Sequence, residues 1–541
     1  MGKEPRNMAY DYVIVGSGAG GSVLAERLTL DPTIKVLLLE SGGSDWNPIH
    51  LIPKGFYFTL TNPKYTKAFI TEPYGEGQVN TFRRGRIVGG STTVNGMIWN
   101  RGWAPQYDAW EEAGNKGWNW ERFLSAFKAL EDHELGANAW RGAGGPVSVS
   151  VAKPRDPISD AFVTAMTKHG APFLEDVNSS GDERVGYVAS NIKRGTRVSA
   201  SRAFLRKARR RQNLVVLDHT EVDRITFDGT VATGVEATRL GQTLRFGARR
   251  EVLICAGALD SPLLLERSGI GDPKVLAAAG VPLRVSSPKV GENMRDHRGS
   301  LQFQLKLKGC GGYNRELNTA LRQGWTGLKY LFTRAGVMSF GGYNVTTAFK
   351  SDPASPFPDT QAYFTPMSSS SVAPNTGRIA LDRFPGAMFI VLSLFPTSVG
   401  SIHITGPRTS DKPRLVSDFL LTDHDRALTV KMFHKARAIL ATEPLAQLFH
   451  EEVTPGPGLQ QDADVLRHAY KGGGGGFHSL GTCAIGPNDD DVVDDRLRVR
   501  GTSRLRVVDA SVFPVIPSGN NNAPTMAMAW IAADLILQDA R

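Results

Sequence analysis

The chain has 541 residues, which is longer than one ordinary domain and predicts two or three. Its 41% hydrophobic and 21% charged residues are typical of a soluble globular protein, and no apolar run reaches the roughly eighteen residues that a membrane span needs. The formal charge of +10 raises the question of nucleic acid, but the one dense basic run, 206–211, has no interleaved aromatic residues for base stacking. We therefore interpret that run as a solvated helix end.

The N-terminal residues and the cysteines exclude further classes. Residues 1–7 contain no apolar stretch of the kind found in secretory signals, so we expect a cytoplasmic location. The three cysteines, Cys255, Cys310 and Cys483, are too few and too scattered for a disulfide framework or a metal site.

The first predicted elements are a strand and a helix joined by glycines. Residues 11–15 are apolar and β-branched, and they run into the pattern G-x-G-x-x-G formed by Gly16, Gly18 and Gly21. Gly16 permits a tight turn, Gly18 lets backbone N–H groups approach a pyrophosphate, and Gly21 lets the following helix pack on the strand. The helix N-terminus adds partial positive charge at the same place.

A second strand completes a βαβ unit. Residues 35–39 read as buried strand and end at Glu40, nineteen positions after Gly21. A carboxylate at this position accepts hydrogen bonds from a ribose and repels a 2′-phosphate, which disfavours NADP. The unit alone does not separate NAD from FAD.

Later segments predict a second domain with a different pattern of strands, and then a C-terminal strand and helix that belong to the first domain. Residues 84–96 offer glycines, hydroxyls and an amide suited to a phosphate or the polar edge of a cofactor, and 106–131 reads as helical. We expect strands at 214–217, 222–227, 231–237 and 251–255, then strands at 301–307, 359–366, 387–395 and 401–405. Residues 301–307 alternate apolar and polar, which predicts one buried and one wet face. A strand at 505–509 and an apolar helix over 526–537 suggest that the C-terminus closes the first domain.

These segments together resemble the glucose–methanol–choline (GMC) oxidoreductase family. The resemblance is carried by Gly16–Gly21 with Glu40, Arg84–Asn95, Gly257–Gly271, Val290–His297, and the stretch from His478 through Asp509 to Asn522. It implies an α/β Rossmann-like, discontinuous FAD-binding domain (1–160, 200–297 and 474–541). It also implies an α+β substrate-binding domain with an antiparallel sheet (161–199 and 298–473).

The resemblance implies FAD as the cofactor. Residues expected around it are Gly16, Gly18, Gly21, Glu40, Gly89, Gly90, Ser91, Asn95, Val222 and Asp509. Some relatives tether FAD through a histidine beside the asparagine of the second block. This chain has Val94 there, so we expect non-covalent FAD.

The resemblance also assigns catalytic roles. Alcohol oxidation removes a hydroxyl proton and passes a hydride to flavin N5, and His478 matches the family's base, with a side chain suited to proton exchange near neutral pH. Asn522 matches the position of a second histidine or an asparagine, whose amide donates to the substrate oxygen. His297 is a weaker candidate with a structural role.

The expected function is oxidation of a primary alcohol to an aldehyde, with O₂ or another electron acceptor. Trp99, Phe477 and residues 363–367 suggest a pocket for an apolar or aromatic alcohol. An FAD-containing lyase of the hydroxynitrile lyase type is the alternative, and we expect neither nucleic acid nor a transmembrane segment. The sequence assigns no role to the glycine run 472–476.

Overall fold

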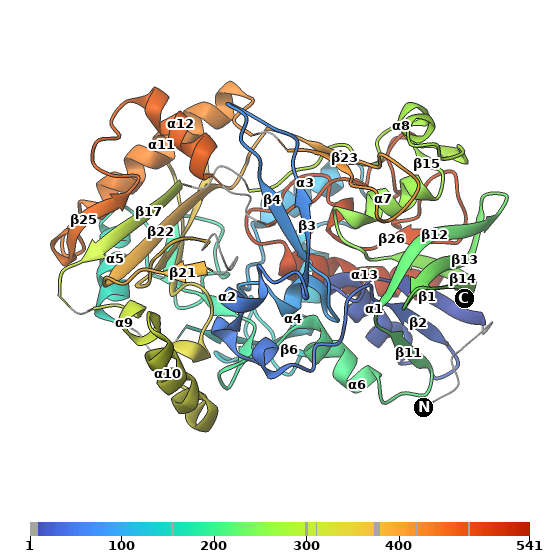
Figure 1. Ribbon diagram of the computed structural model, residues 1–541, viewed down its shortest axis with the longest axis horizontal. Coiled ribbons are helices and arrows are strands. Elements are labelled where there is room, and N and C mark those ends of the chain that lie inside the picture. The colour runs from blue at the N-terminus through green and yellow to red at the C-terminus, as the bar shows by residue number, and fades with distance from the viewer. Residues whose placement is uncertain are drawn as a thin grey trace.

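The computed structural model describes residues 9–540 except 153–155, 298–300, 310, 373–378, 418 and 474–476. Two large sheets lie on opposite sides of the molecule, with the glycine-turn strands on the right in Figure 1 and the β17–β22 sheet on the left. The expectations for residues 1–7, Cys310 and Gly474–Gly476 fall outside the described residues.

The first sheet is built from distant parts of the chain. Its order is β11-β2-β1-β14-β13-β12, and β26 also pairs with β14. The strands are β1 (Ala9–Val15), β2 (Val36–Leu39), β11 (Leu214–Leu217), β12 (Thr220–Asp228), β13 (Val231–Arg239), β14 (Gln242–Ile254) and β26 (Leu505–Val507). β1 runs parallel to β2 and β14, and β26 runs parallel to β14, whereas β12, β13 and β14 pair antiparallel. The expected Rossmann-like, discontinuous sheet is confirmed.

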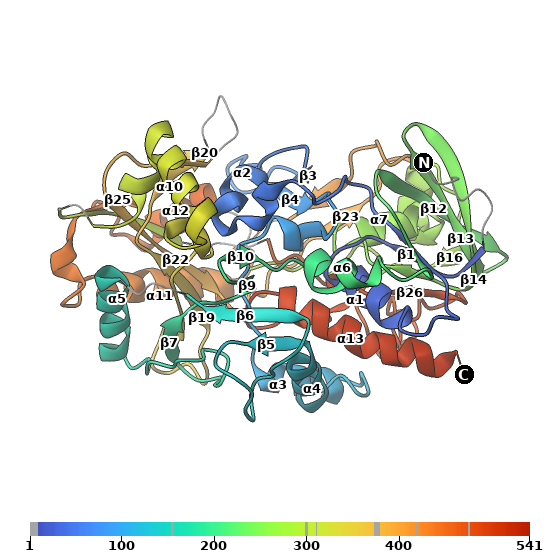
Figure 2. The ribbon, with the colours of Figure 1, turned by 90° about the horizontal axis from the view of Figure 1, so that it is seen from below.

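Two helices bring the chain ends together beside this sheet. α1 (Ala19–Leu28) follows the glycine turn, and α13 (Asn522–Asp539) lies next to it in Figures 1 and 2. Arg27 of α1 bonds Asp534 of α13, and its guanidinium lies 4.2 Å from the centre of the Trp530 ring. This contact fixes the C-terminal helix against the βαβ unit.

The second sheet is antiparallel throughout its strand pairs, as expected. Its order is β25-β17-β22-β19-β18-β7. The strands are β7 (Arg184–Tyr187), β17 (Leu301–Leu307), β18 (Val345–Phe349), β19 (Thr360–Thr365), β22 (Gly386–Ser393) and β25 (Phe449–Thr454). Helices α5 (Pro157–Lys168), α11 (Asp423–Leu440) and α12 (Asp462–Gly472) pack their apolar residues against one face of it.

Because side chains alternate along a strand, one face of this sheet packs in the core and the other lines a cavity. Phe364 and Phe389 lie in the core beneath the helices, while their neighbours Tyr363 and Ile390 line a cavity on the other face. The expected wet face of 301–307 is wrong at Gln304, which is buried and donates to Asp382. Gln302, on the same strand, faces the cavity.

The remaining elements connect or flank the two sheets. The other helices are α2 (Phe56–Thr59), α3 (Ala104–Glu112), α4 (Trp120–Leu130), α6 (Arg206–Ala208), α7 (Asp260–Arg267), α8 (Pro273–Ala278), α9 (Asn314–Leu317) and α10 (Ala320–Thr333). Small sheets are formed by β3 (Thr66–Ile70) with β4 (Thr81–Gly85), by β5 (Glu131–His133), β6 (Val147–Val151) and β8 (Ala189–Ser190), by β9 (Ile192–Lys193) with β10 (Thr196–Arg197), by β15 (Ile270–Gly271) with β16 (Val285–Ser286), by β20 (Ser369–Val372) with β21 (Ile379–Leu381), and by β23 (Ser401–His403) with β24 (Arg414–Val416).

The helix expected over 106–131 is two helices. α3 ends at Glu112 and α4 begins at Trp120, because Gly114 and Gly117 between them adopt φ values of 99° and 79° that a continuing helix cannot use. None of the helices within the described ranges has the length and apolar composition that crossing a bilayer requires.

Candidate active site

A cavity of about 570 Å³ lies between the two sheets. Its walls include the ends of β1 and β2, the block after β4, and the cavity-facing residues of β19 and β22. Of the expected cofactor residues, Gly16, Gly18, Glu40, Gly90, Ser91, Asn95, Val222 and Asp509 line it, and so do both expected catalytic residues, His478 and Asn522. Gly21 and Gly89 are not among the lining residues, but the Gly89 N–H donates to Ser17, which is.

The three glycines of the first turn have three different surroundings. Gly16 has φ 98°, and a Cβ there would lie 2.4 Å from the Cys255 oxygen. A Cβ on Gly21 would lie 1.9 Å from the Gly16 oxygen, so Gly21 lets α1 approach β1. A Cβ on Gly18 would meet nothing within 4 Å, because Gly18 faces the open cavity. This is the arrangement that a pyrophosphate at the helix N-terminus needs.

Glu40 is buried at the end of β2 and tied to both glycine blocks. The Ser17 hydroxyl donates to Glu40 Oε2 at 2.6 Å, and the Gly42 N–H donates to Oε1 at 2.9 Å. The Gly89 N–H in turn donates to Ser17 Oγ at 3.0 Å. Burial raises the pKa of Glu40, against the opposing effect of these hydrogen bonds.

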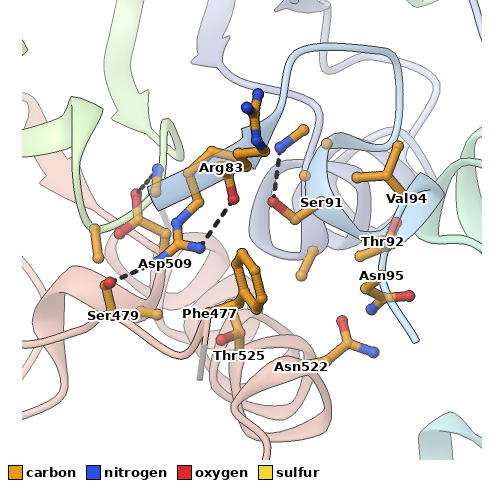
Figure 3. Close-up of a pocket in the computed structure, with 18 of the residues that line it drawn as sticks. Arg83, Ser91, Thr92, Val94, Asn95, Phe477, Ser479, Asp509, Asn522 and Thr525 are labelled. Atoms are coloured by element: carbon orange, nitrogen blue, oxygen red, sulfur yellow. Dashed lines mark hydrogen bonds between the residues drawn. The ribbon is translucent and has the colours of Figure 1, made fainter. Parts of the chain in front are cut away.

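The second block brings its backbone close to the first. Gly89 and Gly90 both have positive φ, and a Cβ on Gly90 would lie 2.8 Å from the Gly18 Cα. Ser91 Oγ accepts from the Gly85 N–H, and Asn95 Oδ1 accepts from Arg197 at 2.9 Å. Figure 3 shows Ser91, Val94 and Asn95 around the same space as Phe477 and Asn522.

Asp509 is buried and holds the segments around it. Its Oδ2 accepts from the Gly257 N–H at 2.8 Å and the Ser261 hydroxyl at 2.6 Å, and its Oδ1 accepts from the Ser511 N–H. Burial raises the pKa of Asp509. Because its acceptors are occupied by the protein, Asp509 shapes the cavity wall through the loops that it fixes.

His478 has both ring nitrogens in hydrogen bonds. Its Nδ1 lies 3.0 Å from His297 Nδ1, and its Nε2 lies 2.9 Å from Asn520 Nδ2. The Asp296 carboxylate positions the backbone by accepting from the His478 N–H at 3.0 Å and from the Ser479 hydroxyl at 3.0 Å. His478 is therefore fixed in position at the cavity wall.

The neighbours of His478 assign its tautomer. Tyr363 donates its hydroxyl to Asn520 Oδ1 at 2.6 Å, so the amide nitrogen of Asn520 is the atom that faces His478. That nitrogen is a donor, which makes His478 Nε2 the acceptor and leaves the proton on Nδ1, where it is donated to His297. The result is an unprotonated Nε2 at the cavity.

Two effects keep His478 neutral. Burial and the positive Arg84 guanidinium both lower its pKa well below the usual range. Arg84 lies close by, because it donates to the hydroxyl of the adjacent Ser479 at 2.6 Å. Burial and the neighbouring His478 lower the pKa of His297 as well.

Among the described residues, Asn522 is not a hydrogen-bond partner of His478. Its Nδ2 donates to Asn191 Oδ1 at 3.2 Å, and its side chain lies toward Asn95 in Figure 3. Asn520 and Tyr363 complete the network instead, and the sequence analysis missed the role of Asn520. The sequence signal for Asn520 is the run of three asparagines, 520–522.

The aromatic residues that the sequence places in the substrate pocket do not all line the cavity. Phe477 and Tyr363 line the cavity, and Tyr363 stacks on Tyr343 with ring centres 4.9 Å apart. Trp99 is buried in the core and donates to Glu131 at 2.6 Å, so its expected place in the pocket is wrong. Cys255 and Cys483 are buried free thiols.

Comparison with known proteins finds similarity over nearly the whole chain. Sequence models of the family described as GMC oxidoreductase match residues 10–298 and 396–529. Choline dehydrogenase, mitochondrial, of Homo sapiens is 36% identical over 99% of this chain and 91% of its own length. Alcohol dehydrogenase [acceptor] of Pseudomonas putida is 32% identical over 98% of this chain and 96% of its own. The crystal structure of pyridoxine 4-oxidase from Mesorbium loti superposes with a TM-score of 0.86 and 29% identity, covering 97% and 98% of the two chains.

Proposed function

Since the chain belongs to the GMC oxidoreductase family, we propose that it oxidises a primary alcohol to an aldehyde with His478 as the general base. The observation that carries this proposal is the unprotonated Nε2 of a fixed, neutral histidine at the cavity wall. Family membership itself confirms the resemblance noted in the sequence, an FAD enzyme and action on CH–OH groups.

The residues present fit FAD. The open space beside Gly18 suits a pyrophosphate, Glu40 suits a ribose, and the donors and amides of the 89–95 block suit the polar edge of a flavin. Val94 forms part of the wall and has no nucleophilic atom, which supports non-covalent binding. When bound, FAD supplies the acceptor for the two electrons and the hydrogen that leave the alcohol carbon.

The protein's own part in the reaction is to hold the hydroxyl and take its proton. The substrate hydroxyl donates to His478 Nε2 in place of Asn520, and the proton is transferred to this atom as the C–H bond breaks. The charge that forms on the ring is stabilised by His297 Nδ1, which accepts from His478 Nδ1. Asn520 and Asn522 supply amide donors for the substrate oxygen. The final acceptor, O₂ or another compound, is part of the proposal.

The shape and charge of the cavity favour an apolar or aromatic alcohol. Apolar and aromatic side chains gather in its wall: Phe56, Leu60, Met97, Ile98, Tyr343, Tyr363, Ile390, Leu392 and Phe477. The stacked Tyr343–Tyr363 pair also favours a second candidate, choline, because aromatic faces attract quaternary ammonium groups.

Charge decides between these two candidates. Arg84 lies beside His478, and each lining carboxylate has a partner: Asp260 pairs with Lys67 at 2.6 Å, Glu221 with Arg86 at 3.3 Å, and Glu40 and Asp509 are hydrogen-bonded as described above. A cationic substrate would therefore meet repulsion near the base without a free carboxylate among the described lining residues. We propose an uncharged primary alcohol.

An anaerobic visible spectrum tests the function and the substrate class together. We expect benzyl alcohol and longer aliphatic alcohols to bleach the flavin band of the purified protein, and choline to bleach it more slowly. Rapid recolouring on admitting air would identify an oxidase, and slow recolouring a dehydrogenase. A flavin band that no alcohol bleaches would contradict the proposal and favour lyase chemistry, whereas fast bleaching by choline alone would reverse the substrate assignment.

Variants of the two asparagines test how the substrate oxygen is held. We expect Asn522→Ala to slow alcohol-dependent bleaching by about 10²–10³-fold, the usual effect of losing one such donor. We expect Asn520→Ala to slow it also, because Tyr363 and His478 lose the amide between them. Asn488→Ala, at the surface-exposed turn before Asp491, is the matched control. Wild-type rates in both cavity variants would remove the amides from the mechanism.

We also propose that this protein is located in the cytoplasm. The human relative differs in this respect, because its name places it in mitochondria.

A further inference from the structure

α10 is attached to the protein along one side only. Tyr330 is its single buried residue, and the Tyr330 hydroxyl donates to the Gly195 oxygen at 2.7 Å. Thr326 and Gln323 add bonds to the oxygens of Glu316 and Leu317. Figures 1 and 2 both show α10 at the periphery of the molecule.

The opposite side of α10 carries an apolar stripe, formed by Leu321, Trp325, Leu328 and Phe332. Their exposed fractions are 86%, 71%, 46% and 84%. At about 100° per residue, these four side chains fall within an arc of about 60°, and Tyr330 lies about 180° from Leu321. The apolar stripe therefore points directly away from the protein, and within the described part of the chain no element covers it.

The charged side chains of α10 itself are all basic. Residues 317–351 contain no Asp or Glu, while Arg322 and Lys329 fall along one flank of the stripe at about 80–100° from Leu321. Both are exposed. Arg194, in the β9–β10 hairpin that accepts the Tyr330 hydrogen bond, is exposed as well. The acidic residue that precedes α10 most closely in the sequence is Glu316, on α9.

We propose that the apolar stripe of α10 docks this enzyme on an anionic lipid surface. A helix with Trp, Phe and Leu on one side and basic residues beside them lies in the plane of a membrane interface, with its apolar side among the acyl chains and its cations at the headgroups. Trp favours this interface because its ring is amphipathic.

A second copy of the chain fits the stripe less well. An antiparallel, twofold-symmetric pair of stripes would place Arg322 and Lys329 of both copies on the same side, where like charges repel. Gly324 and Gly327 within α10 weaken the free helix, and a Cβ on either would meet nothing within 4 Å, so no packing contact of the protein requires them. A surface that supports the helix along its length offsets this weakness.

Co-sedimentation of the FAD-loaded full chain with vesicles tests the proposal. We expect the protein to sediment with vesicles of phosphatidylcholine mixed with phosphatidylglycerol, and less with phosphatidylcholine alone. The double variant Trp325→Ser, Phe332→Ser should bind more than about tenfold more weakly, because two exposed aromatic side chains no longer enter the bilayer. Replacing Arg322 and Lys329 by Gln should weaken binding about fivefold for each charge, on anionic vesicles only.

Matched controls make either result decisive. Leu240→Ser with Leu283→Ser removes two exposed apolar side chains on the side of the molecule away from α10 and should leave sedimentation unchanged. Alcohol-dependent flavin bleaching should be the same in all variants, which establishes that they are folded. Wild-type protein that stays in the supernatant, or equal loss in the control, would overturn the proposal. A dimer that dissociates only in the Trp325, Phe332 variant would assign the stripe to a second copy instead.

Discussion

Replacing His478 with alanine should slow alcohol-dependent flavin bleaching by about 10²–10⁴-fold while FAD remains bound. The variant removes the atom that accepts the hydroxyl proton, Nε2, but leaves the pyrophosphate turn and Glu40 untouched. Stopped-flow spectroscopy under anaerobic conditions gives the bleaching rate, and the absorbance ratio of flavin to protein gives the FAD content.

A surface histidine provides the control for this variant. His424→Ala changes an exposed residue near the start of α11 and should leave both the bleaching rate and the FAD content at wild-type values. Wild-type bleaching in the His478 variant would show that another group takes the proton. Loss of FAD from that variant would mean instead that His478 holds the cofactor.

The pH dependence of bleaching is a second result of the same geometry. Burial and Arg84 lower the pKa of His478 below the ordinary histidine value of about 6.5. The ring is therefore neutral at every pH above about 6.5. We expect the bleaching rate to be constant above this pH and to fall only on its acid side, as Nε2 becomes protonated. A rate that still rises with pH above 7.5 would show that the base is not the neutral His478 described here.

The sequence predicts the βαβ unit well because its signals are local. The glycine turn, the apolar strands on either side and Glu40 all lie within one segment, and β1, α1 and β2 occur where their residues indicate. The predicted strand 251–255 covers only the end of β14, because the part that pairs with β13, 242–247, carries polar and charged residues such as Arg245. This part of the strand has no apolar run by which the sequence could reveal it.

Long-range contacts account for the rest of what the sequence missed. Gln304 is buried because it finds Asp382, 78 residues away, as a hydrogen-bond partner. The choice of Asn520 rather than Asn522 as the neighbour of His478 depends on where α13 begins and on Tyr363, which comes from the other sheet. Three adjacent asparagines have the same chemistry, so position alone separates them.

Replacing Gly18 with leucine should give a folded protein that no longer binds FAD. Gly18 has φ −66°, which any residue adopts, and its Cβ would meet no protein atom within 4 Å. The new side chain would enter the space that faces the helix N-terminus, where the pyrophosphate is expected. Absorbance of the purified protein near the flavin band measures the bound FAD, and thermal unfolding in the absence of added FAD measures the fold.

Two further glycines separate loss of the cofactor from loss of the fold. Gly458→Leu, at an exposed position where a Cβ also meets nothing within 4 Å, should bind FAD normally. Gly21→Val should instead unfold at lower temperature, because a Cβ there would lie 1.9 Å from the Gly16 oxygen and push α1 off β1. If Gly18→Leu kept its flavin, the pyrophosphate would have to lie elsewhere. Because Gly18 and Gly21 are three residues apart, opposite outcomes at these two positions would assign one to the cofactor and the other to the packing beneath it.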